Sequence, residues 1–226
     1  MQLGFWVAVV AVVAWSVLKL DWRHLVSSSP TATYAYGIAR GKLLAAGVFA
    51  GQRHPFEASQ VAPGIWLGSI TDAHCPDELR VRNICGVVTV VIGVQPSYPL
   101  LFDYHSVAVR DVAQEQLAPH FGAAHSFMDN ILKGRSTGGA LTGPHTGPPP
   151  SVLVHYMHGA SRSASVVISY LMRDRRLFLQ EALEQVRRAR PRVNPNSGFM
   201  QQLQAFETQL VAAGHYEVPD PAGSNN

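Results

Sequence analysis

The residues with the clearest chemical potential lie in one short stretch, VLVHYMHGASRSAS, which runs from Val152 to Ser165. A run of apolar strand formers ends at His155, a loop of small residues follows, and a helical pattern begins near Ser163. A helix N-terminus presents free backbone N–H groups and the positive end of the helix dipole, so this order of elements can bind an anion. The stretch predicts either a site for a phosphate-like anion or an ordinary strand-to-helix turn.

The loop residues each have a place in such a site. Gly159 allows the backbone to turn, and Ala160 and Ser161 keep the loop narrow. Arg162 can hold two anion oxygens with its planar guanidinium; in the alternative it makes only a salt bridge. The residues expected to bind the anion are Met157, His158, Gly159, Ala160, Ser161 and Arg162.

Strands and helices alternate along the chain, which predicts an α/β fold with a ligand crevice at the carboxyl ends of the strands. We expect strands within residues 61–69, 86–94, 105–109 and 152–155, and the β-branched run 86–94 is typical of a strand covered on both faces. Three helices are expected at about 71–83 (with Thr71 or Asp72 as N-cap), 117–131 and 179–190. Two more are expected to begin near Ser163 and after Asn196.

The stretch is similar to the phosphate-binding loop of the dual-specificity protein phosphatases, which belong to the cysteine-dependent protein tyrosine phosphatase superfamily. The family pattern is His-Cys-x-x-Gly-x-Ser-Arg-Ser, and the chain matches its fixed positions at His155, Gly159, Ser161, Arg162 and Ser163. PGIWLGSITDA resembles the family's opening strand and helix, YHSVAVRD its strand before the acid loop, and EALEQVRRARPRVNPNSGFMQQLQAFE its closing helices. The resemblance runs from about residue 61 to 210, and its closest members in length are the small atypical ones.

This resemblance implies a protein tyrosine phosphatase-like fold, in which helices flank a central, mostly parallel sheet and the phosphate-binding loop joins a strand to a helix. Arg162 would bind phosphate and stabilise the transferring group, and Asp111 would be the general acid. Ser163 would assist release of the nucleophile, and His155 would orient the loop. For Asp111 a plain loop or N-cap role stays open, and for His155 and Ser163 structural support of the loop does. No cofactor or metal is implied.

Tyr156 departs from the family pattern, because it stands where the family has its nucleophilic cysteine. The family's chemistry needs a thiolate, whereas a phenol has a pKa of about 10 and carries its oxygen several ångströms farther from the backbone. The ring must either fill the pocket or swing aside. We do not expect Cys75, Cys85 or His158 to replace the nucleophile, since nothing in the pattern aims them at the anion.

The sequence thus predicts a pseudophosphatase that binds phosphorylated Ser/Thr/Tyr proteins or acts as a scaffold. Two alternatives stay open: an active phosphatase, with unusual chemistry or a sequence error at position 156, and a membrane-tethered adaptor that binds no phosphate.

Residues 3–18 carry no charge, and Lys19, Arg23 and His24 follow them. This pattern predicts a membrane anchor with the rest of the chain facing the cytosol, although a cleaved signal peptide or a buried segment would also fit. We therefore divide the chain into an anchor (1–24), a linker (25–60), a phosphatase domain (61–213) with a disordered insertion (135–150), and a tail (214–226).

Composition narrows the remaining possibilities. The chain has 226 residues, a net charge of +3 and a pI near 9.0, which is too mildly basic to indicate a nucleic-acid partner. Two cysteines cannot form a disulfide framework or a four-thiolate metal site. The densest basic run is expected to be a solvated helix end, where cations complement the helix dipole; it comprises Arg187, Arg188, Arg190 and Arg192.

Overall fold

A five-stranded sheet forms the centre of the computed structural model, which describes residues 55–135 and 148–216. The strand order is β1-β2-β5-β3-β4. β1 runs antiparallel to β2, and the other neighbouring strands pair in parallel, so the mostly parallel α/β sheet expected from the sequence is confirmed. The strands are β1 (Ser59–Ala62), β2 (Ile65–Ser69), β3 (Ile84–Thr89), β4 (Asp103–Ser106) and β5 (Ser151–Tyr156).

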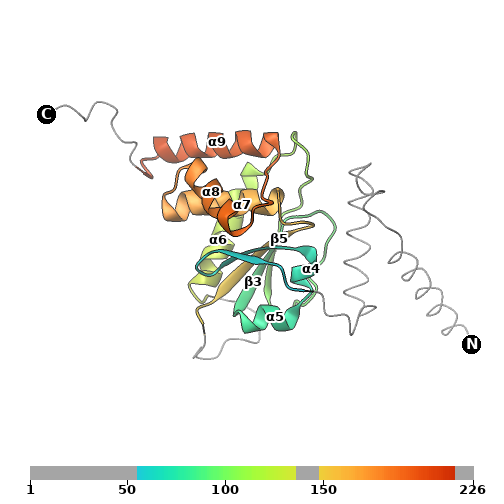
Figure 1. Ribbon diagram of the computed structural model, residues 1–226. Coiled ribbons are helices and arrows are strands. Elements are labelled where there is room, and N and C mark those ends of the chain that lie inside the picture. Colours follow the sequence, from blue (N-terminus) through green and yellow to red (C-terminus); the bar gives the residue numbers. More distant parts are fainter. Residues whose placement is uncertain (1–54, 136–147, 217–226) are drawn as a thin grey trace, which may run out of the picture.

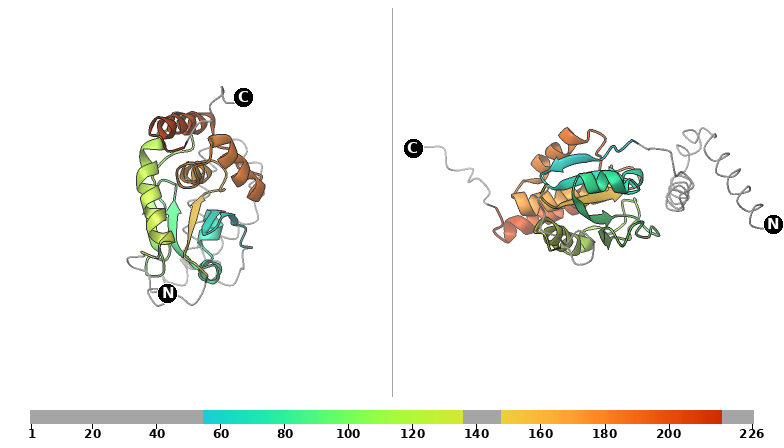
Figure 2. Two further views of the ribbon diagram at one scale, coloured as in Figure 1. Left: turned by 90° about the vertical axis from the view of Figure 1, so that its left-hand side faces the viewer. Right: turned by 90° about the horizontal axis from the view of Figure 1, so that it is seen from below.

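Helices cover both faces of this sheet, as the views in Figures 1 and 2 show. The short helices α4 (Ile70–Ala73) and α5 (Pro76–Val81) lie on one face. The longer helices α6 (Phe121–Leu132) and α7 (Arg162–Arg175) lie on the other. Helices α8 (Leu179–Ala189) and α9 (Ser197–Ala212) pack against α7, and the turn η1 (Ala118–His120) leads into α6.

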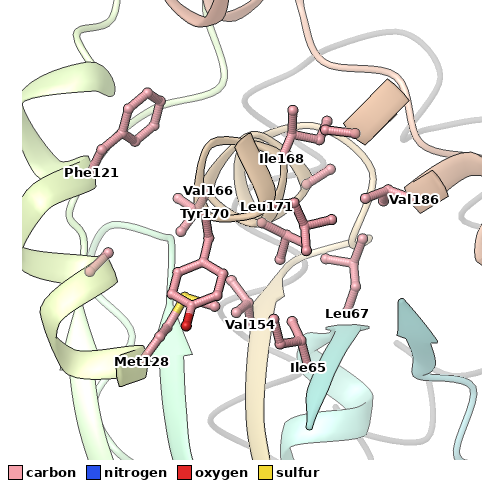
Figure 3. Close-up of a cluster of buried hydrophobic side chains, with 14 of the residues drawn as sticks. Ile65, Leu67, Phe121, Met128, Val154, Val166, Ile168, Tyr170, Leu171 and Val186 are labelled. Carbon is pink, nitrogen blue, oxygen red and sulfur yellow. The ribbon is translucent and has the colours of Figure 1, made fainter. Parts of the chain in front are cut away.

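Burial on both faces follows from the apolar, β-branched central strands. Along β5, Val152 and Val154 belong to the large cluster under α6 and α7, and Leu153 belongs to the smaller cluster on the α4–α5 face. Figure 3 shows the large cluster, where side chains from β2 and β5 meet those of α6, α7 and α8. Each such fully buried side chain contributes about 1.5–3 kcal/mol, so the end of β5 is held firmly.

Several element boundaries differ from the expectation. The region 61–69 holds parts of two strands, and the first of them, β1, begins at Ser59, inside the expected linker 25–60. The predicted helix 71–83 is two short helices, capped at Ser69 rather than at Thr71 or Asp72, and Pro76 opens the second because proline cannot continue a helix. β3 ends at Thr89 rather than continuing to 94; Val90 and Val91 are buried but lie beyond the end of the strand. β4 likewise covers residues 103–106 and not 105–109.

Several predicted segments fall outside the described residues: the anchor 1–24, most of the linker 25–60, nearly all of the insertion 135–150, and most of the tail 214–226. Among residues 55–135 and 148–216, no helix is long and apolar enough to cross a membrane. The apolar stretch 3–18 lies outside these residues, so the expected anchor stays a prediction.

Candidate functional site

The predicted anion-binding loop lies at the carboxyl end of β5, where the sequence placed it. β5 is a central strand between β2 and β3, and it ends at Tyr156; α7 begins at Arg162. Gly159 adopts φ +65°, a conformation that favours glycine. The loop therefore joins a strand held on both sides to the first turn of a long helix, which is a stable place for an anion cradle.

Arg162 is directed into this loop and is almost completely buried, with 2% of its surface exposed. Its Nη1 donates a hydrogen bond of 2.6 Å to the Val109 carbonyl. Its Nε has no hydrogen-bond partner among the described residues and lies 3.8 Å from the Asp111 carboxylate. The guanidinium thus keeps a donor available that the folded protein does not use.

The Tyr156 ring covers that guanidinium. The centre of the ring lies 3.6 Å from Arg162 Cζ, and only 9% of Tyr156 is exposed. The ring also packs with Ile70, Val91 and Met157 in a small apolar cluster. Of the two arrangements that the sequence left open, the structure has the ring in the cradle.

The phenol of Tyr156 is neutral near pH 7. Burial raises its pKa above the ordinary value of 10.0, which outweighs the opposing effect of the Arg162 charge. Asp111 also acts on the hydroxyl and raises the pKa further. A neutral phenol is a weak nucleophile, so the residue is unsuited to attack phosphorus.

Asp111 lies beside the loop, as expected. Its carboxylate accepts hydrogen bonds from Ser161 Oγ at 2.7 Å and from Asn196 Nδ2 at 2.9 Å. The backbone N–H of Asn196 in turn donates to Ser161 Oγ at 3.2 Å, and the Asn196 side chain caps α9. From the sequence, Asn196 was expected only as the residue before a helix, and its link between Asp111 and the loop was not predicted.

His155 and Ser163 lie behind the loop and support it. His155 is 2% exposed and shares a hydrogen bond of 2.8 Å between its Nε2 and Thr89 Oγ1. Burial lowers the pKa of His155 to about 3, so the ring is neutral. Ser163 is completely buried, and its hydroxyl has no partner among the described residues. Neither side chain faces solvent, which favours a structural role in this state.

The other candidate nucleophiles are poorly suited to replace a thiolate in the loop. The Cys75 thiol donates to the Thr71 carbonyl at 3.4 Å, and burial raises its pKa to about 11. Burial also raises the pKa of Cys85, whose thiol donates to the Asn83 carbonyl. His158 is exposed, as the sequence predicted. In the two described ranges, no three His, Cys, Asp or Glu side chains are placed to hold a metal ion.

Arg190 corrects the expectation of a solvated helix end. It is only 3% exposed, and its Nε donates to the Gly159 carbonyl at 3.0 Å. Residues 187, 188 and 192 are exposed, as expected. A signal was present in the sequence, because Ala182, Val186 and Arg190 recur every four residues, a spacing that continues the buried face of α8 to Arg190, the residue that follows its last turn.

Comparison with known proteins agrees with this geometry. The model of the family "Dual specificity phosphatase, catalytic domain" matches residues 65–209, which is more than half of the chain. The chain is 34% identical over 154 residues to dual specificity protein phosphatase 1B of Arabidopsis thaliana, a match that covers 68% of this chain and 84% of that protein.

Solved structures give the same result. A crystal structure of a mouse putative dual specificity phosphatase in complex with zinc tungstate superimposes with a TM-score of 0.61 and 28% identity, and covers 73% of this chain and 95% of that one. The human tyrosine phosphatase-like serine/threonine/tyrosine-interacting protein gives a TM-score of 0.60 and 27% identity, with 70% and 99% covered. Together with the family match, these likenesses show that the chain belongs to the dual-specificity phosphatase family.

Proposed function

We propose that the chain is a pseudophosphatase, in which Tyr156 replaces the nucleophilic cysteine of the family. It binds phosphorylated Ser/Thr/Tyr proteins, or acts as a scaffold in phospho-signalling, without hydrolysing the phosphate. The observation that carries this proposal is the position of the Tyr156 ring, 3.6 Å from the Arg162 guanidinium at the start of an otherwise complete phosphate-binding loop.

The absence of turnover follows from the chemistry of the phenol. Family members form a cysteinyl-phosphate, which requires a thiolate at the floor of the loop. Burial keeps the Tyr156 hydroxyl protonated, and the ring lies where the phosphate would bind. Losing a covalent nucleophile costs on the order of 10⁶-fold in rate in well-studied hydrolases, which would leave activity near background.

Phosphate recognition survives in this proposal, because the rest of the cradle is present. If the ring swings aside, Arg162 offers its unpartnered Nε and the loop offers its backbone N–H groups. Stacking of a cation on an aromatic ring stabilises the closed state by about 0.5–2 kcal/mol, and charge-assisted hydrogen bonds to a phosphate dianion can exceed that. The apparent association constant for phosphate is then the intrinsic constant multiplied by the fraction of molecules in which the cradle is open.

A second candidate is an adaptor that binds no phosphate. The closed ring favours it, since the ring packs on the Arg162 guanidinium and leaves Tyr156 9% exposed and Arg162 2% exposed. A third is an active phosphatase, which would require a sequence error or an unusual nucleophile at position 156.

The first experiment is a phosphatase assay on a phosphotyrosine peptide with the full-length chain. We expect no turnover by the wild type above an Arg162→Ala control, and at least 10³-fold recovery for Tyr156→Cys, because Arg162 and Asp111 are in place beside the restored thiol. Vanadate-sensitive hydrolysis by the wild type above the control would overturn the proposal and favour the active enzyme.

The second experiment separates phosphate recognition from a purely structural role. Inorganic phosphate and a phosphopeptide are titrated into the wild type and into Tyr156→Ala, with NMR shifts of the loop amides as the readout. We expect tighter binding by Tyr156→Ala, since its cradle is open, and no binding by Arg162→Ala. If even Tyr156→Ala fails to bind either probe, the adaptor without phosphate binding replaces the leading proposal.

Membrane attachment is a separate part of the proposal. It is supported by the uncharged residues 3–18 and the basic residues that follow them, which would place the phosphatase-like domain on the cytosolic side. Cell fractionation tests it: the full-length protein should sediment with membranes, and a variant with Val9→Asp and Val12→Asp should not. Recovery of the wild type in the soluble fraction would contradict it.

A further inference from the structure

The outer side of the phosphate-binding loop is held by Arg190. Its Nε donates to the Gly159 carbonyl at 3.0 Å, and its Nη2 donates to the His158 carbonyl at 3.3 Å. Its Nη1 reaches away from the loop to the Glu57 carbonyl at 2.8 Å and, more weakly, to Ser59 Oγ at 3.4 Å. All three guanidinium nitrogens are therefore engaged, and one side chain joins the loop to the segment that leads into β1.

These bonds determine which way the loop's N–H groups point. In a planar trans peptide the carbonyl and the following N–H point in opposite directions. When Arg190 holds the His158 and Gly159 carbonyls outward, the N–H groups of Gly159 and Ala160 must face the cradle. The Asn194 N–H does the same for the next peptide, since it donates to the Ala160 carbonyl at 2.8 Å.

The loop has little room to move in this region. A Cβ atom added at Gly159 would lie 2.4 Å from the Gly68 carbonyl oxygen and 2.9 Å from Arg190 Nη2. The backbone is thus wedged between the end of β2 and the arginine, so that a shift of either one moves the loop.

The far end of this connection is fixed as well. The Glu57 N–H donates to Asp72 Oδ1 at 2.6 Å, and Asp72, which is 1% exposed, also accepts from Ser69 Oγ at 2.7 Å at the cap of α4. Glu57 and Ser59 precede Ile65, where the match to the family model begins. The loop is therefore anchored partly by residues that lie outside the matched family region.

We infer that Arg190 is a positioning residue for the phosphate-binding loop, and that residues 57–59 complete its anchor. The segment by which the chain enters the fold thereby helps to set the inward direction of the loop's N–H groups. The consequence for phosphate affinity rests on the proposed function, whereas the consequence for loop order does not.

The test compares Arg190→Lys with Arg188→Lys in the full-length chain. Lysine keeps the charge but cannot reach three sets of acceptors as one planar fork does. Arg188 is an exposed arginine in the last turn of α8, two residues before Arg190. The readout without ligand is the ¹⁵N order parameter of the amides of residues 157–161. We expect it to fall from about 0.85 to below about 0.6 in Arg190→Lys only, with the amides of β3 unchanged.

Titration of inorganic phosphate then measures the consequence for binding. We expect Arg190→Lys to bind phosphate about tenfold more weakly than the wild type, and Arg188→Lys to bind it with unchanged affinity. A loop as rigid in Arg190→Lys as in the wild type would overturn the inference. If no variant binds phosphate and yet Arg190→Lys loosens the loop, the proposed phosphate recognition fails and the positioning role stands.

The role of residues 57–59 needs its own pair of variants. Glu57→Pro removes the N–H that donates to Asp72, whereas Glu57→Gln changes only the exposed carboxylate and keeps the backbone bonds. We expect Glu57→Pro to lower the loop order parameters, about 100 residues away in sequence, and Glu57→Gln to leave them unchanged. If the order parameters of residues 157–161 are unchanged from the wild type in both variants, residues 57–59 are not part of the anchor.

Discussion

Two buried arginines hold the same loop from opposite sides. Arg162, inside, is 2% exposed and Arg190, outside, is 3% exposed. Arg190 uses all three of its nitrogens in bonds to carbonyls and a hydroxyl, whereas Arg162 leaves its Nε without a partner beneath the Tyr156 ring. A buried donor without a partner costs about 1–3 kcal/mol, so Arg162 is the side chain with an interaction left to make. The hydrogen bonds of Arg190 on the outer side of the loop are complete in the folded protein, whereas Arg162 on the inner side keeps an unpaired donor.

Other polar groups near the loop also differ in whether they have hydrogen-bond partners. Besides Arg162 Nε, the buried polar atoms without a partner in the described residues include His155 Nδ1 and Ser163 Oγ, which flank the same position of the loop. On the outer side, the carbonyls of residues 158–160 are all hydrogen-bonded. Three of the five unsatisfied groups of the described residues therefore belong to residues at the two ends of the loop, and the other two are Trp66 Nε1 and Tyr216 Oη.

Among single substitutions, the largest expected effect comes from removing Arg190. Arg190→Ala should lower the free energy of unfolding by about 4 kcal/mol, because it removes the donors to three backbone carbonyls. Arg162→Ala should cost only about 1–2 kcal/mol, since it loses one bond to a carbonyl. Urea unfolding of both variants measures this difference. Equal losses would show that the two arginines contribute alike to the fold, and would contradict the view that Arg190 holds the loop while Arg162 is kept for a ligand.

Acid should also destabilise the fold, because two buried histidines stay neutral in the folded chain but take up protons in the unfolded chain. Burial lowers the pKa of His155, behind the loop, and of His125, between α6 and α7, to about 3. In the unfolded chain each histidine takes up a proton below about pH 6.5, whereas in the folded chain each stays neutral. The free energy of unfolding should therefore fall by about 1.4 kcal/mol per pH unit per histidine between pH 6.5 and 3.

Unfolding measured in urea at several pH values tests this slope. His125→Gln should reduce the slope, because it removes one of the two histidines whose pKa is lowered to about 3. A slope that is unchanged in His125→Gln would contradict the assignment of the acid sensitivity to these two rings.

The smallest effect is expected from Tyr156→Phe. Phenylalanine keeps the ring against Arg162 and in the small apolar cluster, and removes only the hydroxyl beside Asp111. We expect a change below about 1 kcal/mol in unfolding free energy, against about 3 kcal/mol for Tyr156→Ala, which deletes the ring. Thermal unfolding of the two variants checks this, and a large loss in Tyr156→Phe would show that the hydroxyl, not the ring, holds the cradle closed.

Much of the fold could be predicted because its signals are local. The alternation of strands and helices, the loop after β5 and the position of Asp111 each depend on short patterns, and the structure has them where expected. The errors arose where a local pattern had two structural outcomes. The apolar run after Thr89 is buried but leaves the sheet, and the basic run 187–192 contains one arginine that faces inward.

The sequence by itself determined that the loop has an arginine, a glycine and an aspartate partner but a tyrosine in place of a thiol, because residue identity at each position is a local property. Only the tertiary structure decided that the ring lies over Arg162 and that Arg190 fastens the loop to Glu57. Tyr156 and Arg162 are close in the chain, but the bonds that place the two arginines are not: Arg162 and Val109 are separated by 53 positions, and Arg190 and Glu57 by 133. The packing of the sheet and helices brings such pairs together, and no short pattern encodes which of them will meet.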